Sequence, residues 1–355
     1  MKTIGIDLWD GQARAAPNVA TMMRPAQRPH VLAVDARALF LTAYPKLVGV
    51  CRAVQEPGLA VIAVDERTGR PAGIVTLRAR IGRPVAAVVG RHDRCDLYLA
   101  GHEELALRQL AVVMAPVASF TPGTSVAYRV MDLRTGGGMA DESGRALRGL
   151  RAEGPSVLRC GGYLMYMLPL GDPTDWPERA DDAWAMLPER VYFDELDHAA
   201  GGSVRDLRVQ AGQVRQASQA PNLRATQSVV FRVQGPRDTG MALVGARGED
   251  LAGQLEIIGT HRRVTLDVDQ TALRDGILIG RYERCDGGAA IDDPSLSRVH
   301  ALLVHADDRL LMVDTASFNG TRVSGGEPMR LVELDRDLEL ALGKGTRIRW
   351  RWTAG

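Results

Sequence analysis

The organisation of the chain follows from three short segments near its C-terminus: Gly280-Arg281, Ser297-Arg298-Val299-His300 and Asn319-Gly320-Thr321. Each contains a glycine or another turn-forming residue beside a polar side chain, a composition typical of tight loops. Apolar runs lie between them, such as Ala301-Leu302-Leu303-Val304 directly after His300. Short strands connected by polar loops are therefore expected in this region.

The first of these segments occurs twice in the chain. Residues 280–286 read Gly-Arg-Tyr-Glu-Arg-Cys-Asp and residues 90–96 read Gly-Arg-His-Asp-Arg-Cys-Asp, which are identical at five of seven positions with an offset of 190 residues. After an eight-residue insertion around Ser119 to Ser125 the offset becomes 182. The register is kept by the pairs Arg108 and Arg298, Ala111 and Ala301, Asp132 and Asp314, Leu158 and Leu340, and Gly161 and Gly343. Two regions of roughly 100 residues are therefore expected to share one architecture.

Strand-like runs at short spacing, without regular helices between them, predict an all-β fold of two antiparallel β-sandwiches joined by a linker. The predicted segments are an N-terminal arm over residues 1–58, a first sandwich over 59–170, a linker over 171–245 and a second sandwich over 246–355. Residues 1–30 lack hydrophobic periodicity, whereas the spacing from Ala36 to Val54 predicts a helix interrupted at Pro45. The linker is expected to contain short helical pieces, and strand-like runs return from Ser228 onward.

The composition is that of a globular protein without a dominant charge. The 355 residues are 45% apolar and 25% charged, and the net charge is +1. This balance argues against binding to nucleic acid or to an anionic membrane surface. No apolar run reaches the ~18 residues of a membrane helix and no secretory signal is recognisable, so a cytoplasmic protein is expected. All but three of the 44 basic residues are arginine, which lowers the weight of any single arginine as a functional signal.

Familiar catalytic and metal-binding motifs are absent from the sequence. The four cysteines form no C-x-x-C pair and the seven histidines are scattered, so neither a metal site nor a cofactor is expected. No G-x-S-x-G or H-E-x-x-H pattern occurs. The glycine-rich Gly136-Gly137-Gly138 lacks the Lys-Ser/Thr of a nucleotide phosphate loop. A protein without enzymatic activity is therefore expected.

The three C-terminal segments, in this order, resemble the forkhead-associated (FHA) domain, a reader of phosphothreonine peptides. The preceding Asp292-Asp293-Pro294-Ser295-Leu296 and the closing Leu340-Ala341-Leu342-Gly343 fit the same family. The resemblance covers residues 250–355 well and 70–170 poorly. One stretch departs from it, because Gly287-Gly288-Ala289-Ala290 replaces the short β-branched run that is usual in the family.

The resemblance implies separate roles for the site residues. Arg281 and Ser297 would bind the phosphate, and Asn319 would hold the main chain of the peptide. These roles suit the chemistry, because a guanidinium forms charge-assisted hydrogen bonds to phosphate and an amide both donates and accepts. The other residues implicated are Arg298, Phe318 and Thr321 as ligand contacts, and Gly280, His300 and Gly320 as support for the loops.

The first copy lacks most of these groups. In the register of the repeat, Arg91 is retained, while the replaced positions are Leu107 opposite Ser297, Leu110 opposite His300, Gly137 opposite Asn319 and Met139 opposite Thr321. A leucine cannot donate to a phosphate, and burying a phosphate against it would be costly. The first copy is therefore expected to keep the fold without phosphothreonine binding and to serve architecture or protein binding.

These observations favour a non-enzymatic adaptor whose C-terminal module binds phosphothreonine on a partner protein, with a Ser/Thr kinase or a kinase substrate as the expected class. Two alternatives remain open. Both sandwiches could serve constitutive assembly, with Arg281 and Ser297 unused or occupied by an acidic segment. An enzyme could also reside in the first 60 residues or in the linker. Binding to a phosphothreonine peptide and to its unphosphorylated twin separates the adaptor from the assembly protein.

Overall fold

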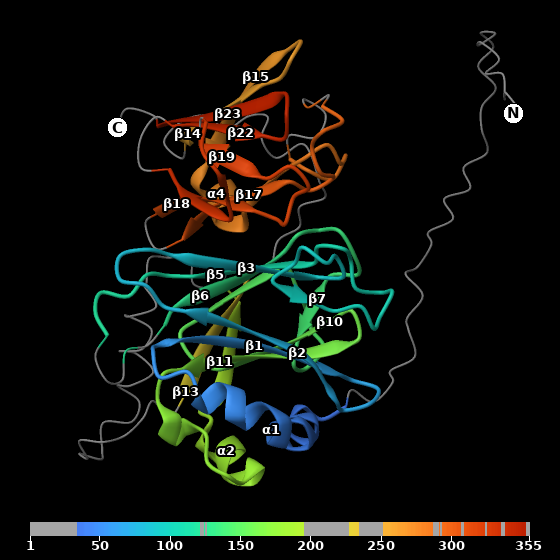
Figure 1. Ribbon diagram of the computed structural model, residues 1–355, viewed down its shortest axis with the longest axis vertical. Helices are drawn as coiled ribbons and strands as arrows, with labels where there is room; N and C mark the ends of the chain where they lie inside the picture. The colour runs from blue at the N-terminus through green and yellow to red at the C-terminus, as the bar shows by residue number, and fades with distance from the viewer. Residues whose placement is uncertain are drawn as a thin grey trace, which may run out of the picture. The chain divides into compact units, whose positions relative to one another are not determined.

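The computed structural model describes residues 34–120, 124, 126–194, 227–233, 251–286, 291, 293–306, 309–323, 325–334 and 338–352. Over these residues the chain is mostly β, and its strands pair almost entirely antiparallel, which confirms the predicted fold class (Figure 1). Residues 1–33 of the predicted N-terminal arm and the departure at residues 287–290 lie outside the described part. None of the described helices combines the length and the apolarity needed to cross a bilayer.

The first sandwich consists of a six-stranded and a seven-stranded sheet. The six-stranded sheet has the order β2 (Pro71–Arg78), β1 (Gly58–Asp65), β11 (Tyr163–Leu170), β10 (Ser156–Cys160), β7 (Met139–Asp141) and β8 (Ala146–Leu147). The seven-stranded sheet has the order β12 (Glu189–Asp194), β13 (Gln227–Val233), β9 (Gly149–Ala152), β6 (Tyr128–Asp132), β5 (Leu110–Met114), β3 (Val85–Gly90) and β4 (Leu97–Tyr98). Apolar side chains of both sheets, including Leu59, Val112 and Tyr128, fill the space between them.

The second sandwich repeats this arrangement with a six-stranded and a four-stranded sheet. The six-stranded sheet has the order β15 (Arg263–Asp269), β14 (Leu251–Ile258), β23 (Thr346–Trp352), β22 (Glu339–Leu342), β19 (Thr321–Val323) and β20 (Pro328–Met329). The four-stranded sheet has the order β16 (Ile277–Ile279), β17 (Ala301–Ala306), β18 (Arg309–Asp314) and β21 (Leu331–Glu333), and α4 (Gln270–Asp275) links β15 to β16. Apart from β4, β12 and β13, the strand order is the same in both sandwiches, so the sequence repeat is matched by a repeat of topology.

Helix α1 (Ala36–Arg52) covers the outer face of the first sandwich together with η1 (Pro173–Asp175) and α2 (Ala180–Met186) (Figure 1). Its buried Phe40 and Tyr44 pack with apolar side chains that β1 and β11 turn away from the sandwich interior, such as Tyr166. The interruption predicted at Pro45 is wrong, because the helix continues through it. Proline has no N–H to donate to the carbonyl of Leu41, four residues earlier. Pro45 lies on the exposed side of the helix, where water can hydrate that carbonyl.

Part of the segment predicted as a linker belongs to the first sandwich. β13 pairs antiparallel with β9, and β12 pairs in parallel with β13, so both strands extend the seven-stranded sheet. The sequence predicts strand character near Ser228 but not its partner, because β9 is remote in the chain. The first sandwich therefore extends beyond residue 170, the boundary predicted from the sequence.

The two sandwiches also pack directly against each other. Their contact is an apolar cluster to which β3, β5 and β6 of the first and β16, β17 and β18 of the second contribute. In β17, Leu303 faces the interior of the second sandwich, whereas Leu302 and Val304 belong to the contact between sandwiches. Alternate side chains of one strand point to opposite faces, so both faces of this sheet are buried. The cluster includes Cys95 and Cys285, which occupy matching positions of the repeat.

Candidate functional site

Loops of the second sandwich line a pocket of about 400 Å³. The loops are those after β16, before β17 and after β18, which carry the three segments singled out in the sequence. The predicted residues that line it are Arg281, Ser297, Arg298, Phe318 and Asn319, and they are joined by Lys344. Every charged side chain in its lining is basic. The pocket therefore suits an anionic ligand.

Arg281 reaches the pocket from the loop after β16. Gly280 allows this loop to approach its neighbour, since a Cβ at that position would overlap the carbonyl oxygen of Arg298. Arg281 Nε donates to the carbonyl oxygen of Leu296 at 2.9 Å, which ties the guanidinium to the loop before β17. Its two terminal nitrogens have no hydrogen-bond partner among the described residues, so both remain available to an anion.

The loop before β17 is shaped by Asp293 and presents Ser297. The Asp293 carboxylate accepts hydrogen bonds from Ser295 N and from Thr346 Oγ1, both at 2.8 Å. Burial acts to raise the pKa of Asp293, but these hydrogen bonds outweigh burial and hold the pKa below its usual value. Ser297 Oγ accepts a hydrogen bond from Phe318 N at 2.9 Å, so the hydroxyl proton remains available for donation.

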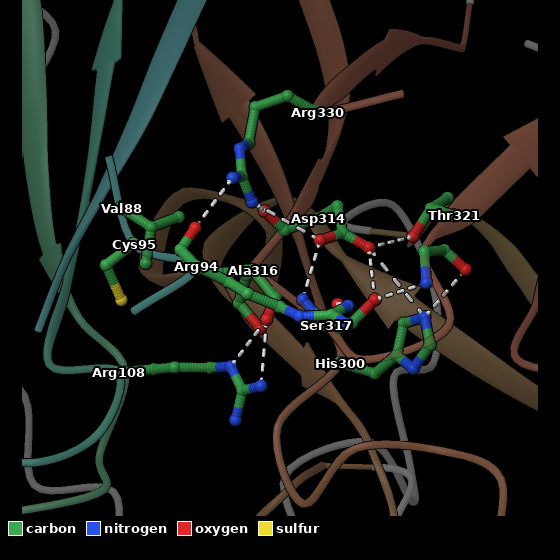
Figure 2. A network of polar contacts seen from close by, with 12 residues as sticks. Val88, Arg94, Cys95, Arg108, His300, Asp314, Ala316, Ser317, Thr321 and Arg330 are labelled. Carbon is green, nitrogen blue, oxygen red and sulfur yellow. Dashed lines mark hydrogen bonds and ion pairs between the residues drawn. The ribbon is translucent and has the colours of Figure 1, made fainter. Parts of the chain in front are cut away.

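The loop after β18 is built around the buried Asp314 (Figure 2). The carboxylate accepts hydrogen bonds from Ser317 N at 2.8 Å, from Ser317 Oγ at 2.6 Å and from Thr321 Oγ1 at 2.9 Å. Thr321 is buried, and its hydroxyl supports the loop. The resemblance to FHA domains instead predicts a contact between Thr321 and the ligand. Asn319 Nδ2 donates to the carbonyl oxygen of Ser295 at 2.7 Å, which connects this loop to the one before β17.

His300 lies beneath these loops and is fully buried. Its Nδ1 accepts a hydrogen bond from Ser297 N at 3.3 Å, and its Nε2 donates to the carbonyl oxygen of Gly320 at 3.2 Å. Burial lowers the pKa of His300, and the Asp314 carboxylate, 3.8 Å away, offsets this only in part. The neutral ring therefore ties the two loops together. Gly320 has a φ of 75°, a conformation that favours glycine.

The same hydrogen bonds recur in the first sandwich, one residue away from the register drawn from the sequence. Ala106 N donates to Gln109 Oε1 at 3.1 Å, as Ser297 N donates to His300. The residue opposite Ser297 is therefore Ala106, the residue opposite His300 is Gln109, and the pairing with Leu107 and Leu110 is wrong. The predicted pairs of Arg108 with Arg298 and of Ala111 with Ala301 are wrong for the same reason, because Val89 pairs with Leu110 where Ile279 pairs with Ala301. The gap of one residue lies in the connection from β3 to β5, which is shorter by one residue than the connection from β16 to β17. A comparison of the two copies at one constant offset does not show where such a gap falls.

The corrected register does not restore a hydroxyl donor to the first sandwich. Ala106 has no hydroxyl, so the first sandwich lacks the donor that Ser297 offers. The framework around that position is retained, since Arg91 Nε donates to the carbonyl oxygen of Leu105 at 3.0 Å, as Arg281 does to Leu296. Gln109 also donates to Asp132 Oδ1 at 3.0 Å, which replaces the imidazole by an amide in the same structural position.

Two arginines of the first sandwich also contact the loop after β18. Arg108 Nε and Nη2 donate to the carbonyl oxygen of Ala316 at 3.0 and 2.8 Å (Figure 2). Arg94 donates to the carbonyl oxygen of Phe318, and its guanidinium carbon lies 4.5 Å from the centroid of the Phe318 ring. Both arginines lie in the first copy of the repeat, but no sequence signal indicates that they face the other copy.

No metal centre is found among the described residues, where no group of three or more His, Cys, Asp or Glu side chains converges. All four cysteines are buried and unpaired. Burial raises the pKa of each thiol, to about 12 for Cys51 and Cys285 and to about 11 for Cys95. Thiols that stay protonated are poor nucleophiles and poor metal ligands.

Residues 277–350 match the family model of the FHA domain. This part of the chain is an FHA domain. FHA domains are phosphopeptide-recognition modules, and the matched residues contain the three loops of the pocket. No relative among curated proteins matched the chain.

Several of the similar solved structures are FHA domains. The FHA-1 domain of Rv1747 from Mycobacterium tuberculosis is 18% identical over 29% of this chain and 99% of its own, with a TM-score of 0.24. The FHA domain of the CT664 protein from Chlamydia trachomatis is 23% identical over 29% of this chain and 99% of its own, with a TM-score of 0.26. EmbR from Mycobacterium tuberculosis, in complex with a low-affinity phosphopeptide, is 22% identical over 31% of this chain and 27% of its own, with a TM-score of 0.25.

Proposed function

We propose that this protein is an adaptor that binds phosphothreonine-containing segments of a partner protein through its C-terminal FHA domain. The observation that carries the proposal is the pocket in which Arg281, Ser297 and Asn319 meet and in which every charged lining residue is basic. A phosphothreonine brings nearly two negative charges and three acceptor oxygens. The pocket offers matching donors on loops that are already held in place by Asp293, His300 and Asp314.

Each side chain has a distinct part in this proposal. Arg281 gives two terminal nitrogens to phosphate oxygens, and Ser297 gives its hydroxyl proton. Asn319 already spends one amide hydrogen on Ser295, and its remaining groups hold the main chain of the peptide. Arg298 and Phe318 are exposed at the edge of the pocket and contact the residues that flank the phosphothreonine. Gly280, His300, Gly320 and Thr321 hold the loops.

The first sandwich is proposed as a degenerate FHA-like copy that does not read phosphothreonine. It has the same strand order and keeps Arg91, but it offers Ala106 and Gly137 where the active copy has Ser297 and Asn319. We assign to it residues 58–170 together with β12 and β13, and to the FHA domain residues 251–352. Its role in this proposal is architectural, because its seven-stranded sheet covers the outer face of the four-stranded sheet of the FHA domain.

The partner is proposed to be a cytoplasmic Ser/Thr kinase or one of its substrates, since these are the proteins that carry phosphothreonine. The proposal involves no catalysis, cofactor, nucleic acid or membrane. Constitutive assembly through both sandwiches is the outcome that the test below would favour if phosphate had no effect on binding.

The test is a calorimetric titration of the full chain with a phosphothreonine peptide and with its unphosphorylated twin. We expect the phosphorylated peptide to bind much more tightly than its unphosphorylated twin. Ser297→Ala should weaken its binding by about 1 kcal/mol, because one neutral donor is lost. Asn319→Ala should weaken both peptides alike, since it holds main chain and not phosphate. Equal binding of the two peptides to the unmodified protein would refute the proposal.

A further inference from the structure

Arg108 of the first sandwich stands between two pockets. It lines the pocket that contains Arg281, and it also lines a second pocket of about 290 Å³ that contains Arg91. Arg298 of the FHA domain lines both pockets as well. The two pockets are therefore neighbours, and an arginine from each sandwich stands at the boundary between them.

The positive charge is concentrated at this boundary. The charged residues lining the pocket of Arg281 are Arg108, Arg281, Arg298 and Lys344. The second pocket adds Arg91, but it also contains the exposed Glu103 and Glu104. An anionic group is therefore favoured most strongly beside Arg108 and Arg298, on the side that faces Arg281.

Arg108 is held in place by hydrogen bonds but still has a donor group available. Two of its nitrogens are bonded to the carbonyl oxygen of Ala316, and Nη1 has no hydrogen-bond partner among the described residues. Burial lowers the pKa of Arg108, and Arg298 and Arg94 act in the same direction, but the group stays cationic at neutral pH because its ordinary pKa is so high. A guanidinium already held in place loses little side-chain entropy when it binds an anion.

The main chain that Arg108 holds is itself unusual. Ala316 has a φ of 62°, a left-handed conformation that is uncommon for a residue with a side chain. Two residues further on, Phe318 begins the part of the loop that lines the pocket. Strained main chain that persists through surrounding contacts is typical of segments that clamp ligands. The contact from the first sandwich therefore bears directly on the binding loop.

We propose that the phosphopeptide site is composite, and that Arg108 of the first sandwich, together with Arg298, binds a second anionic group of the same peptide. This inference rests on the proposed function. The second group is a carboxylate of Asp or Glu, or a second phosphate, close in sequence to the phosphothreonine that Arg281 binds. The degenerate copy thus selects among phosphothreonine peptides without binding a phosphothreonine alone.

The experiment measures the affinity of the full chain for a set of peptides that share one phosphothreonine. A reference peptide has neutral residues around it. In a second series a single Glu is moved through three positions on each side, and in a third series a second phosphothreonine takes those positions. At one or more positions the added anion should tighten binding to the unmodified protein by about fivefold, a size expected for a partly exposed charge pair.

Arg108→Gln should abolish that gain while the reference peptide still binds in a phosphate-dependent way. Arg108→Lys keeps the positive charge, so it should retain most of the gain in affinity from the added anion. This variant replaces Arg108→Gln in the test if the glutamine variant folds poorly. A gain that disappears only in the phosphate series assigns the second group to a phosphate, and a gain lost in both series assigns it to any anion.

The matched control is Arg129→Gln. Arg129 also crosses from the first sandwich to the second, where it donates to the carbonyl oxygens of His305 and Arg274, but it lines neither pocket. This variant should keep the full gain from the added anion, even if its unfolding temperature falls.

Three results would overturn the inference, and each is distinct. If the unmodified protein binds the reference peptide and its unphosphorylated twin equally, the proposed function fails and the inference fails with it. If phosphate matters but the gain from the added anion is unchanged in Arg108→Gln, only the inference fails. If Arg108→Gln weakens every peptide by the same factor, Arg108 is a support of the loop and does not contact the ligand.

Discussion

Arg281 and Arg284 lie three residues apart on one exposed loop, yet only Arg281 lines the pocket. Arg284 instead lies over the ring of Tyr282, with its guanidinium carbon 5.7 Å from the centroid. In a chain with so many arginines, position relative to the other loops distinguishes a ligand contact from a solvated side chain. The two residues therefore form a natural test pair.

Arg281→Ala should remove two charge-assisted hydrogen bonds to the phosphate. We expect a net loss of about 3 kcal/mol, which corresponds to roughly a hundredfold weaker binding. Arg284→Ala removes equal charge from the same loop, but Arg284 does not line the pocket, so this variant should bind like the unmodified protein. Titration with the phosphothreonine peptide measures both, and an Arg281→Ala variant of undiminished affinity would show that the phosphate binds elsewhere.

The stability that His300 contributes to the folded protein should depend on pH. Its pKa in the folded protein is lowered by burial, so the unfolded chain takes up a proton at a higher pH than the folded one does. The stability that the neutral ring provides is therefore complete above about pH 6.5, the ordinary pKa of histidine, and decreases as the pH falls below that value.

The first sandwich supplies the variant that tests this point. Gln109 fills the corresponding position there, so His300→Gln should fold. Glutamine does not titrate, so the decrease in unfolding free energy that the histidine causes between about pH 7 and 5 should be absent from this variant. His300→Ala should lose about 3 kcal/mol at neutral pH, because two hydrogen bonds between buried loops are removed. Denaturant unfolding across this pH range is the measurement. Identical pH profiles for the unmodified protein and His300→Gln would contradict the prediction.

At the scale of elements, the site depends on how closely the loop after β16 approaches the loop before β17. Tyr282 N donates to the carbonyl oxygen of Arg298 at 3.0 Å, which closes one loop onto the other. Gly280 lies at the point of nearest approach. In the first sandwich, a Cβ at Gly90 would overlap the carbonyl oxygen of Leu107 in the same way. The close approach of the two loops therefore explains the glycine in both copies.

Gly280→Ala should force the two loops apart and cost about 2 kcal/mol of unfolding free energy, as overpacking typically does. Phosphopeptide binding should weaken as well, because Arg281 and Ser297 lie on the two displaced loops. Gly137→Ala is the control, since a Cβ there meets nothing within 4 Å. Thermal unfolding and titration test both variants, and a Gly280→Ala protein that is as stable as the control would be inconsistent with the close approach.

For the whole molecule, the contact between the two sandwiches covers an apolar face of the FHA domain. The outer face of the four-stranded sheet carries Leu278, Leu302, Val304, Leu311 and Val313, all of them buried. In an FHA domain without its neighbour this face would meet water. An apolar patch of this kind on an isolated domain promotes self-association.

A fragment of residues 246–355 should therefore self-associate and unfold at a lower temperature than the same region in the full chain. Leu302→Lys should reduce self-association of the fragment, because it places a charge on the exposed face. The same substitution in the full chain should destabilise the protein by several kcal/mol, since it buries that charge, on the order of the cost of an unpaired buried ion. Light scattering and thermal unfolding measure these effects. A fragment that stays monomeric and as stable as the full chain would argue against the interface.

The sequence by itself determined the two antiparallel sandwiches, their repeat and the three loops that form the pocket. These follow from local signals, because strand periodicity, turn glycines and motif order are properties of neighbouring residues. The continuous apolar run at Ala301–Val304 also contained a signal for the contact between sandwiches, since a strand buried on both faces shows no polar alternation.

The folded chain was needed to show which residues of the two copies correspond, where β13 pairs and which arginines reach the pocket. The equivalence of Gln109 and His300 rests on hydrogen bonds between loops, and a one-residue gap cannot be located from an offset. β13 joins β9 across a long stretch of chain, so its pairing leaves no local pattern. Arg108 contacts Ala316 because two sheets pack face to face, and in a sequence rich in arginine such a contact has no signature.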